Sequence, residues 1–202
     1  MRNFAFLIGL LLCFTACNKH KNSTSSPQVH EFKGIAVINS NGEIMGEWGT
    51  DDGDWGNDAT WSAEEFQLLN FQDTVSLSGT YVRDTVGWNI GPGIHVQPHN
   101  EVLSFTNPAA SQQYLVYFGL GLLKFKAVIV DKYFNPLFTY CSRDSGRVVH
   151  IDLSDSTKFQ NGVIYRMYYS FSATDSLHFY KGHGDILICR EQTLNDCRKY
   201  VP

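Results

Sequence analysis

The densest group of chemically active side chains lies in residues 50–58, where carboxylates alternate with glycine. Its candidate metal ligands are Asp51, Asp52, Asp54 and Asp58. Calcium takes about six to eight oxygen ligands from a backbone that folds tightly, which this composition permits. The spacing departs from the EF-hand pattern, because Gly56 stands where a third ligand should be. Two interpretations remain: a calcium site outside the EF-hand class, as in a calcium-stabilised adhesion module, and the favoured one, a solvated acidic loop with Asx turns.

Histidine and serine supply weaker candidates for chemistry. His95 and His99 form one close pair and His178 and His183 another, but neither pair is expected on a helix, where an i, i+4 spacing would bring two imidazoles onto one metal, and Pro98 rules out a regular helix between the first two. No G-x-S-x-G nucleophile motif occurs in the chain. An envelope hydrolase or carbohydrate-active enzyme without a recognisable motif is therefore the alternative, and a non-catalytic protein without a cofactor is the favoured interpretation.

Three cysteines, Cys141, Cys189 and Cys197, lie in the part of the chain expected to fold. Cys189 and Cys197 enclose a short turn-like segment and are predicted candidates for a local disulfide. Pairing of Cys141 with either of them, or three unpaired thiols, are the alternatives. No C-x-x-C spacing suggests a zinc site.

The four tryptophans, Trp48, Trp55, Trp61 and Trp88, all fall in the N-terminal half among Asp, Asn and Gly. Planar rings beside polar groups are typical of surfaces that bind a glycan or a protein partner. The competing and favoured interpretation is that these rings cover a hydrophobic core.

The elements that must position these residues are predicted to be mostly strands. Residues 34–38 and 43–48 flank an Asn-Gly step, which predicts a β-hairpin. Alternation of apolar and polar residues, with turn residues between the runs, predicts further antiparallel strands. These strands are expected at residues 73–83, 102–106, 113–118, 125–131, 137–141, 147–153, 163–171, 177–180 and 186–189.

One short helix is predicted near residues 63–70. Ser62 and Glu65 have the spacing of a capping box, and Trp61 and Phe66 occupy the positions of a hydrophobic staple. The helix should place Phe66 and Leu69 on one face, against a sheet. No long amphipathic helix is available for a parallel βαβ unit. The predicted fold class is therefore all-β, an antiparallel β-sandwich with one short helix.

The N-terminus has the order of a secretory signal peptide. Arg2 supplies positive charge, residues 4–14 are apolar, and Thr15 and Ala16 place small side chains before Cys17. The segment 14–17 resembles the lipobox of bacterial lipoproteins. That resemblance implies cleavage before Cys17 and acylation of Cys17, including a palmitate-like chain on its amine. The expected localisation is the outer membrane of a bacterial envelope, and the lipid bilayer is the expected partner.

The segment that follows the cysteine is polar and is predicted to be a flexible tether. Its basic residues Lys19, His20 and Lys21 stand where surface-displayed Bacteroidetes lipoproteins carry acidic ones, which favours the periplasmic face. Without residues 1–16, 15 basic residues remain against 20 acidic ones. This acidic chain lacks the basic cluster that nucleic-acid binding requires. An envelope protein or a glycan is the expected partner of the folded part.

Several motifs in the second half resemble the C-terminal sorting domains of type IX secretion in Bacteroidetes. The motifs are FTNPA at 105–109, KAVIVDKYFNPLFTY at 126–140, HIDLSD at 150–155 and NGVIYRMYYS at 161–170. The resemblance implies an immunoglobulin-like sandwich. A further stretch, DWGNDATWSAEEFQLLNF at 54–71, looks like part of small Bacteroidetes lipoproteins. We expect a signal peptide at 1–16, a tether at 17–29, a hairpin, acidic loop, helix and strand region at 30–100, and a sandwich domain with a C-terminal tail at 101–202.

Overall fold

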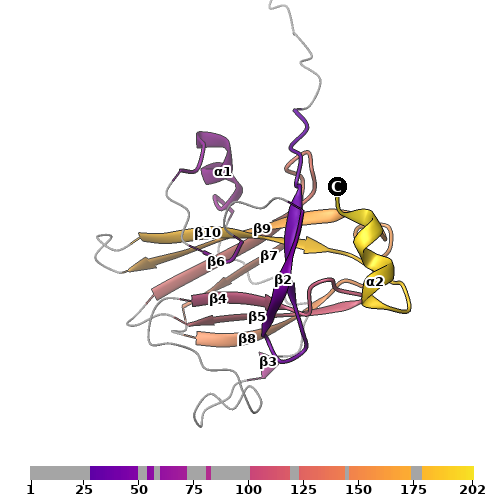
Figure 1. Ribbon diagram of the computed structural model, residues 1–202. Coiled ribbons are helices and arrows are strands. Elements are labelled where there is room, and N and C mark those ends of the chain that lie inside the picture. Colours follow the sequence, from indigo (N-terminus) through magenta and orange to yellow (C-terminus); the bar gives the residue numbers. More distant parts are fainter. Residues whose placement is uncertain are drawn as a thin grey trace, which may run out of the picture.

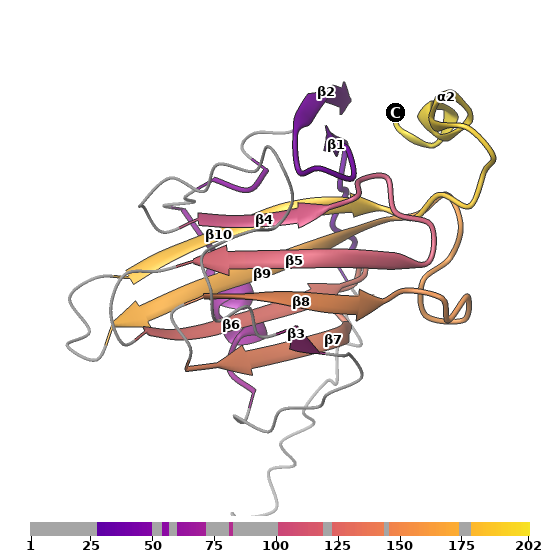
Figure 2. The ribbon, with the colours of Figure 1, turned by 90° about the horizontal axis from the view of Figure 1, so that it is seen from below.

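Two antiparallel sheets packed face to face form the body of the protein (Figures 1 and 2). The fold is taken from a computed structural model. It describes residues 28–49, 54–56, 60–71, 81–82, 101–118, 123–143, 146–173 and 179–202. One sheet has the strand order β10-β9-β6-β7 and the other β3-β8-β5-β4. Their strands are β3 (Tyr81–Val82), β4 (Glu101–Phe105), β5 (Gln112–Phe118), β6 (Leu123–Val130), β7 (Pro136–Ser142), β8 (Gly146–Asp152), β9 (Ile164–Ala173) and β10 (Phe179–Leu187).

The remaining elements attach to this sandwich. They are the hairpin of β1 (Gly34–Ile38) and β2 (Ile44–Gly49), the helix α1 (Ala63–Leu68), the short C-terminal helix α2 (Leu194–Cys197) and the 3-10 turn η1 (Arg198–Tyr200). Among the described residues, no helix has the length and apolar character needed to cross a membrane.

The strand order is that of an immunoglobulin-like sandwich. β4, β5 and β8 correspond to strands A, B and E, and β7, β6, β9 and β10 to C′, C, F and G. Tyr165, at the start of β9, makes the tyrosine corner of such folds: its hydroxyl accepts from the Gln160 N–H (2.7 Å) and donates to the Lys158 carbonyl (3.0 Å). The predicted all-β antiparallel sandwich is confirmed.

The core between the sheets is rich in aromatic rings. Alternate residues of β6 point inward, so that Phe125, Ala127 and Ile129 are fully buried. The Phe125 ring stacks on Tyr117 of β5 at 3.9 Å between centroids, and the hydroxyl groups of Tyr117 and Tyr140 are hydrogen-bonded to each other. Burial of each large apolar side chain contributes about 1.5–3 kcal/mol, so this layer provides much of the stability.

The N-terminal segment covers the outer face of sheet β10-β9-β6-β7. Trp61 and Leu69 pack with Val128 and Val130 of β6 and with Tyr168 of β9. Burial raises the pKa of Tyr168 well above its usual range, and its hydroxyl donates to a Glu65 carboxylate oxygen of α1 at 2.9 Å. A second buried layer therefore lies outside the sandwich.

The predicted capping box of α1 is confirmed. The Ser62 hydroxyl accepts from the Glu65 N–H, and the Glu65 carboxylate accepts from the Ser62 N–H. The helix is two residues shorter than predicted. Phe66 and Leu69 do not share a buried face, because Leu69 is buried whereas Phe66 is 45% exposed and packs edge-on against Trp61.

One strand prediction was wrong: β10 is a single strand where two, at 177–180 and 186–189, were expected. The gap expected between them contains Gly182 and Gly184, and both glycines lie within β10. A Cβ at Gly184 would stand 2.4 Å from the Trp55 ring, and one at Gly182 would stand 2.0 Å from the Gly56 carbonyl oxygen. The glycines are needed because residues 54–56 lie directly against this strand.

The predicted hairpin is confirmed, with β1 paired to β2 and Gly42 in the left-handed region at φ 79°. The predicted strands from residue 102 to 171 match β4 to β9 within two residues at each end. Most of the strand expected at 73–83 lies outside the described residues.

Candidate functional site

Several predicted site residues lie outside the part of the chain that the structure describes. These are Cys17, Asp51, Asp52, Asp58 and Trp88. Of the predicted candidates, the structure places Asp54, Trp48, Trp55, Trp61, Cys189 and Cys197.

The Asp54 carboxylate accepts hydrogen bonds from backbone N–H groups and is not exposed in a solvated loop. One of its carboxylate oxygens accepts from the Asp185 N–H of β10 (2.6 Å) and the other from the Ala36 N–H of β1 (3.0 Å). Asp54 thus ties the hairpin to the edge of the sandwich. Within the described ranges, no group of three or more His, Cys, Asp or Glu side chains is arranged to hold a metal ion.

Asn107 also links β1 to β10 through its side chain. Its side-chain amide nitrogen donates to the carbonyls of Ala36 and Asp185, both at 2.8 Å, and its side-chain oxygen accepts from the Leu187 N–H at 3.1 Å. Asn107 is 1% exposed. Together, Asp54 and Asn107 occupy backbone groups at the outer edges of β1 and β10.

A buried ion pair lies beside this junction. Arg166 of β9 holds the fully buried Asp185 through two hydrogen bonds of 2.6 and 2.7 Å, and its guanidinium lies over the Phe32 ring. Burial disfavours the charge of Arg166, but the Asp185 carboxylate outweighs that effect and raises the pKa of the guanidinium. The pair fixes the N-terminal segment on the sheet.

Two of the predicted ligand-binding tryptophans are core residues. Trp55 is 8% exposed and packs flat on Gly184, and Trp61 is 7% exposed beneath α1. Neither ring is open to a ligand in this structure. For Trp55 and Trp61, the interpretation that the rings cover the core is the correct one.

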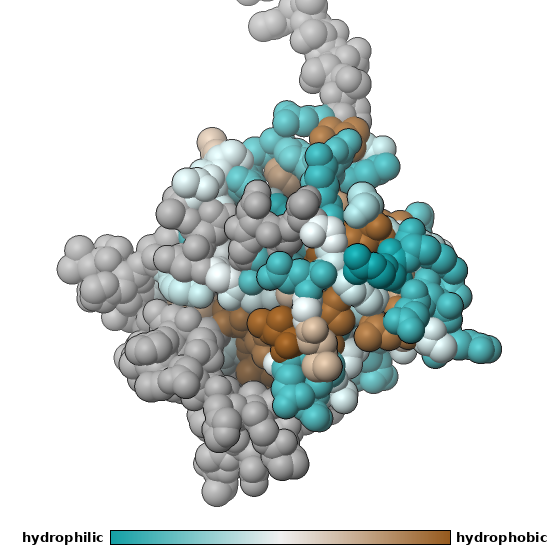
Figure 3. All heavy atoms as spheres, viewed as in Figure 1, coloured by the Kyte–Doolittle hydropathy of each residue, from teal (hydrophilic) through white to brown (hydrophobic). Residues whose placement is uncertain are grey.

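Trp48 differs from them, because it is half-buried at the end of β2. The Arg198 guanidinium lies 5.6 Å from the centre of its ring. Ile44 and Met45, on the same strand, are each 64% exposed. We call the group formed by Ile44, Met45, Glu47, Trp48 and Arg198 the β2 surface. Figure 3 shows apolar side chains reaching the surface on this face, around the start of the hairpin's second strand.

Among the residues that the structure describes, no strand pairs with the outer edge of β2. Successive residues of a strand direct their N–H and C=O groups to opposite edges. On β1, the outward groups of Ile38 bond Asn107 (2.8 and 2.9 Å), and those of Ala36 bond Asp54 and Asn107. Ile44 and Glu47 lie directly opposite these two residues. Their N–H and C=O groups therefore point away from β1.

No further hydrogen bond to Ile44 or Glu47 exists within the described part of the chain. Met45 is the extra residue of a β-bulge between these two positions, and Gly46 beside it has φ 149°. The bulge explains why the two outward-facing residues are three positions apart rather than two. The β2 surface thus combines unpaired backbone groups with exposed apolar side chains.

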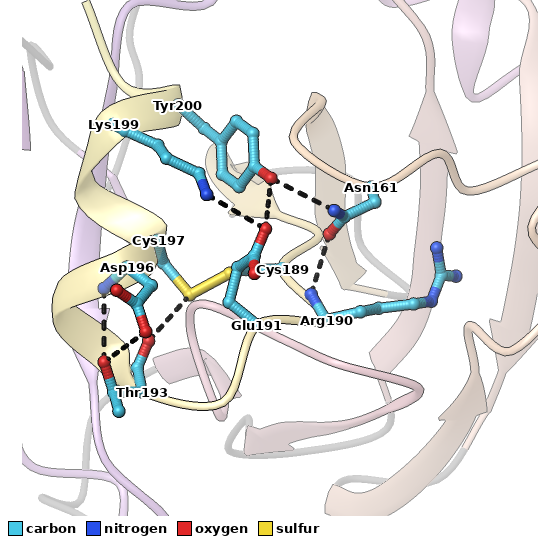
Figure 4. A network of polar contacts seen from close by, with 9 residues as sticks. All are labelled: Asn161, Cys189, Arg190, Glu191, Thr193, Asp196, Cys197, Lys199 and Tyr200. Carbon is cyan, nitrogen blue, oxygen red and sulfur yellow. Dashed lines mark hydrogen bonds and ion pairs between the residues drawn. A yellow bond between two sulfur atoms is a disulfide. The ribbon is translucent and has the colours of Figure 1, made fainter.

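The C-terminal segment 189–200, which we call the C-terminal cap, packs against the hairpin and is held together by a disulfide and polar contacts (Figure 4). Cys189 and Cys197 form a disulfide with a Cα–Cα distance of 5.8 Å, while Cys141 is buried and is not part of a disulfide. Cys197 packs with Ile35 and Val37 of β1. Of the arrangements that the sequence leaves open, the structure contains the local disulfide.

Polar contacts complete the cap. Glu191 accepts from the Tyr200 hydroxyl and from Lys199 Nζ (3.1 Å), and these hydrogen bonds lower the pKa of the Glu191 carboxyl. The Tyr200 ring lies against Gly162, where a Cβ would stand 2.6 Å from it. The cap is therefore fastened to the β8–β9 loop as well as to the hairpin.

A row of stacked rings on sheet β3-β8-β5-β4 was not predicted from the sequence. Phe105, Tyr114 and His150, on neighbouring strands, have centroids 5.6 and 5.2 Å apart and nearly parallel planes. At these distances the rings stack against one another, which covers the faces between neighbours, while Tyr114 stays 40% exposed. We interpret the row as cross-strand pairs that stabilise the sheet. Its register depends on three strands, which no local sequence signal reveals.

Comparison of the chain with protein-family models, curated proteins and solved structures found no match.

Proposed function

We propose that this protein is an envelope lipoprotein whose sandwich is a non-catalytic module that binds a protein partner. The N-terminal order of charge, apolar run and small residues before Cys17 supports anchoring by acylation at Cys17. One acyl chain gives marginal membrane binding and two or more give stable anchoring. The bilayer that holds the protein is the outer membrane, with the domain on its periplasmic face.

The proposal that this protein binds a partner rests on the unpaired edge of β2. Ile44 and Glu47 present outward N–H and C=O groups, and another polypeptide in extended conformation offers the matching groups. The partner's chain lies along β2 and packs apolar side chains on Ile44 and Met45. Trp48 and Arg198 flank the contact, and Trp and Arg are the residue types most enriched among energetically dominant interface positions.

The bulge and the charge of β2 restrict which partner fits. Met45 interrupts the regular ladder, so the partner pairs over a short stretch at each side of it rather than along the whole strand. Glu47 is exposed, and a second Glu47 opposite it would be repelled. A partner segment with a basic residue near Glu47 and apolar residues near Ile44 is therefore favoured over a second copy of this chain.

Crosslinking in the native envelope tests the binding module. A photoreactive amino acid at Met45 is expected to trap one discrete partner, because the side chain lies on the β2 surface. The same amino acid at Tyr114 is the control, since Tyr114 is also exposed but lies on β5, in a different sheet from the hairpin. Identical adducts at both positions, or none at Met45, would contradict the proposed site.

Metabolic labelling tests the anchor. A tagged fatty acid is expected to label the wild-type protein and to be absent from a Cys17→Ser variant. A wild-type product that carries no label and stays in the soluble fraction would contradict anchoring at Cys17.

A further inference from the structure

The turn between β6 and β7 is held by hydrogen bonds to Asp131 and exposes one aromatic side chain. A carboxylate oxygen of Asp131 accepts from the N–H groups of Tyr133 (2.8 Å) and Asn135 (2.9 Å). Phe134 has φ 60° and is 8% exposed, whereas its neighbour Tyr133 is 40% exposed. The turn therefore buries one ring and displays the other.

The first described residues of the chain are fastened to this turn. The His30 N–H donates to the Lys132 carbonyl (2.8 Å), and the His30 ring stacks on Phe134 with 3.5 Å between centroids. Val29, the residue before, is 52% exposed. The point at which the folded part begins is thus fixed beside the exposed Tyr133.

We propose that a surface formed by Val29, Lys132 and Tyr133 lies against the lipid bilayer in the anchored protein. This inference rests on the proposed function, because it requires an acylated Cys17. The 11 residues from Asn18 to Gln28 separate that cysteine from Val29. Even fully extended, they reach at most about 40 Å. We call the three residues the anchor-side surface.

The chemistry of this surface suits the region where lipid headgroups meet acyl chains. Tyrosine is enriched there, because its ring is apolar and its hydroxyl can stay in water. Lys132 is exposed and its ammonium lies 5.2 Å from the centre of the Tyr133 ring, so a positive charge beside the ring is accessible to phosphate groups. Lys33, nearby in the chain, is 57% exposed but paired with Glu31, so it contributes less net charge.

The fold then sets the orientation of the domain. In Figure 1, α1 and the start of the described chain lie on the side of sheet β10-β9-β6-β7, and the turn of the β1–β2 hairpin lies on the side of the other sheet. With the anchor-side surface on the bilayer, the start of β2 faces away from the membrane. A partner from the periplasm reaches the β2 surface without displacing lipid.

Fluorescence from two matched positions tests the inference. Tyr133→Cys and Tyr114→Cys are made in the full acylated chain, because both tyrosines are 40% exposed and Tyr114 lies on the opposite sheet. The new thiols can be labelled selectively, since Cys141 is buried and Cys189 and Cys197 form a disulfide. Each protein carries an environment-sensitive dye and is reconstituted into vesicles of phosphatidylethanolamine and phosphatidylglycerol.

The dye at position 133 is expected to shift to the blue and to be quenched several-fold more by spin-labelled lipid than the dye at position 114. Val29→Cys provides a second position on the same surface and is expected to behave like 133. Flotation with the vesicles and equal quenching at all three positions would overturn this inference alone. A protein that does not float with the vesicles would overturn both this inference and the anchor at Cys17.

Discussion

Replacement of Asn107 by alanine should strongly destabilise the fold. The substitution removes three buried hydrogen bonds, to Ala36, Asp185 and Leu187, and leaves two carbonyls and one N–H with fewer partners. Each such bond contributes about 1 kcal/mol, and each buried group left unsatisfied adds to the loss, so we expect about 3–5 kcal/mol in total. That is a large part of the about 5–15 kcal/mol that stabilises an ordinary domain.

Urea unfolding followed by tryptophan fluorescence measures this loss, with Asn107→Asp as the informative companion. The aspartate keeps an oxygen for the Leu187 N–H but turns an oxygen, rather than an amide donor, toward the Ala36 and Asp185 carbonyls. At neutral pH it should be at least as damaging as alanine. The loss of unfolding free energy in Asn107→Asp should become smaller as the pH falls, because the protonated carboxyl donates one hydrogen bond. If both variants unfold within about 1 kcal/mol of the wild type, less than the three bonds predict, the assigned role of Asn107 is wrong.

Three further predictions concern other parts of the fold. Gly184→Ala should cost about 1–3 kcal/mol in thermal unfolding, because the added Cβ meets the Trp55 ring, and an unchanged melting temperature would contradict that contact. Cys197→Ser should cost about 2.5 kcal/mol in urea, from the entropy of a loop with a sequence separation of 8, and a wild-type midpoint would show that the bridge does not constrain the chain. Because the pKa of Glu191 is lowered in the folded protein, its contribution is present above the pKa of the unfolded carboxyl and is lost as the pH falls through the folded value. Glu191→Gln should therefore flatten the acid side of the stability profile, and an unchanged profile would exclude this contribution.

The parts of the fold that depend on neighbours in sequence were predictable. The Asn-Gly hairpin and the capping box of α1 need only a few consecutive residues, and both are present. Alternation located most strands of the sandwich, because one face of each strand packs in the core. The two-strand prediction for β10 failed because the expected gap holds Gly182 and Gly184, which stay in the strand and make room for residues 54–56.

Contacts between distant segments account for what the sequence did not reveal. Asp54 looked like a loop carboxylate, and its bond to Asp185 spans 131 positions in the chain. The burial of Trp55, which was the favoured interpretation of the sequence, depends on contact between the same distant segments. Tyr165 is a partial exception, because a tyrosine early in the strand after a turn is a signal of the sandwich fold that local reading can find.

The domain boundary that the sequence predicts at residue 100 separates β10 from the residues that cover its outer edge. A polypeptide trimmed to start at Glu101 would retain that strand but lose the carboxylate that holds the Asp185 N–H and the Trp55 N–H that donates to the His183 carbonyl. An exposed strand edge of this kind can pair with the same edge of another molecule. A truncated protein for crystallisation should therefore begin before His30. Truncations that begin at Glu101 are expected to aggregate.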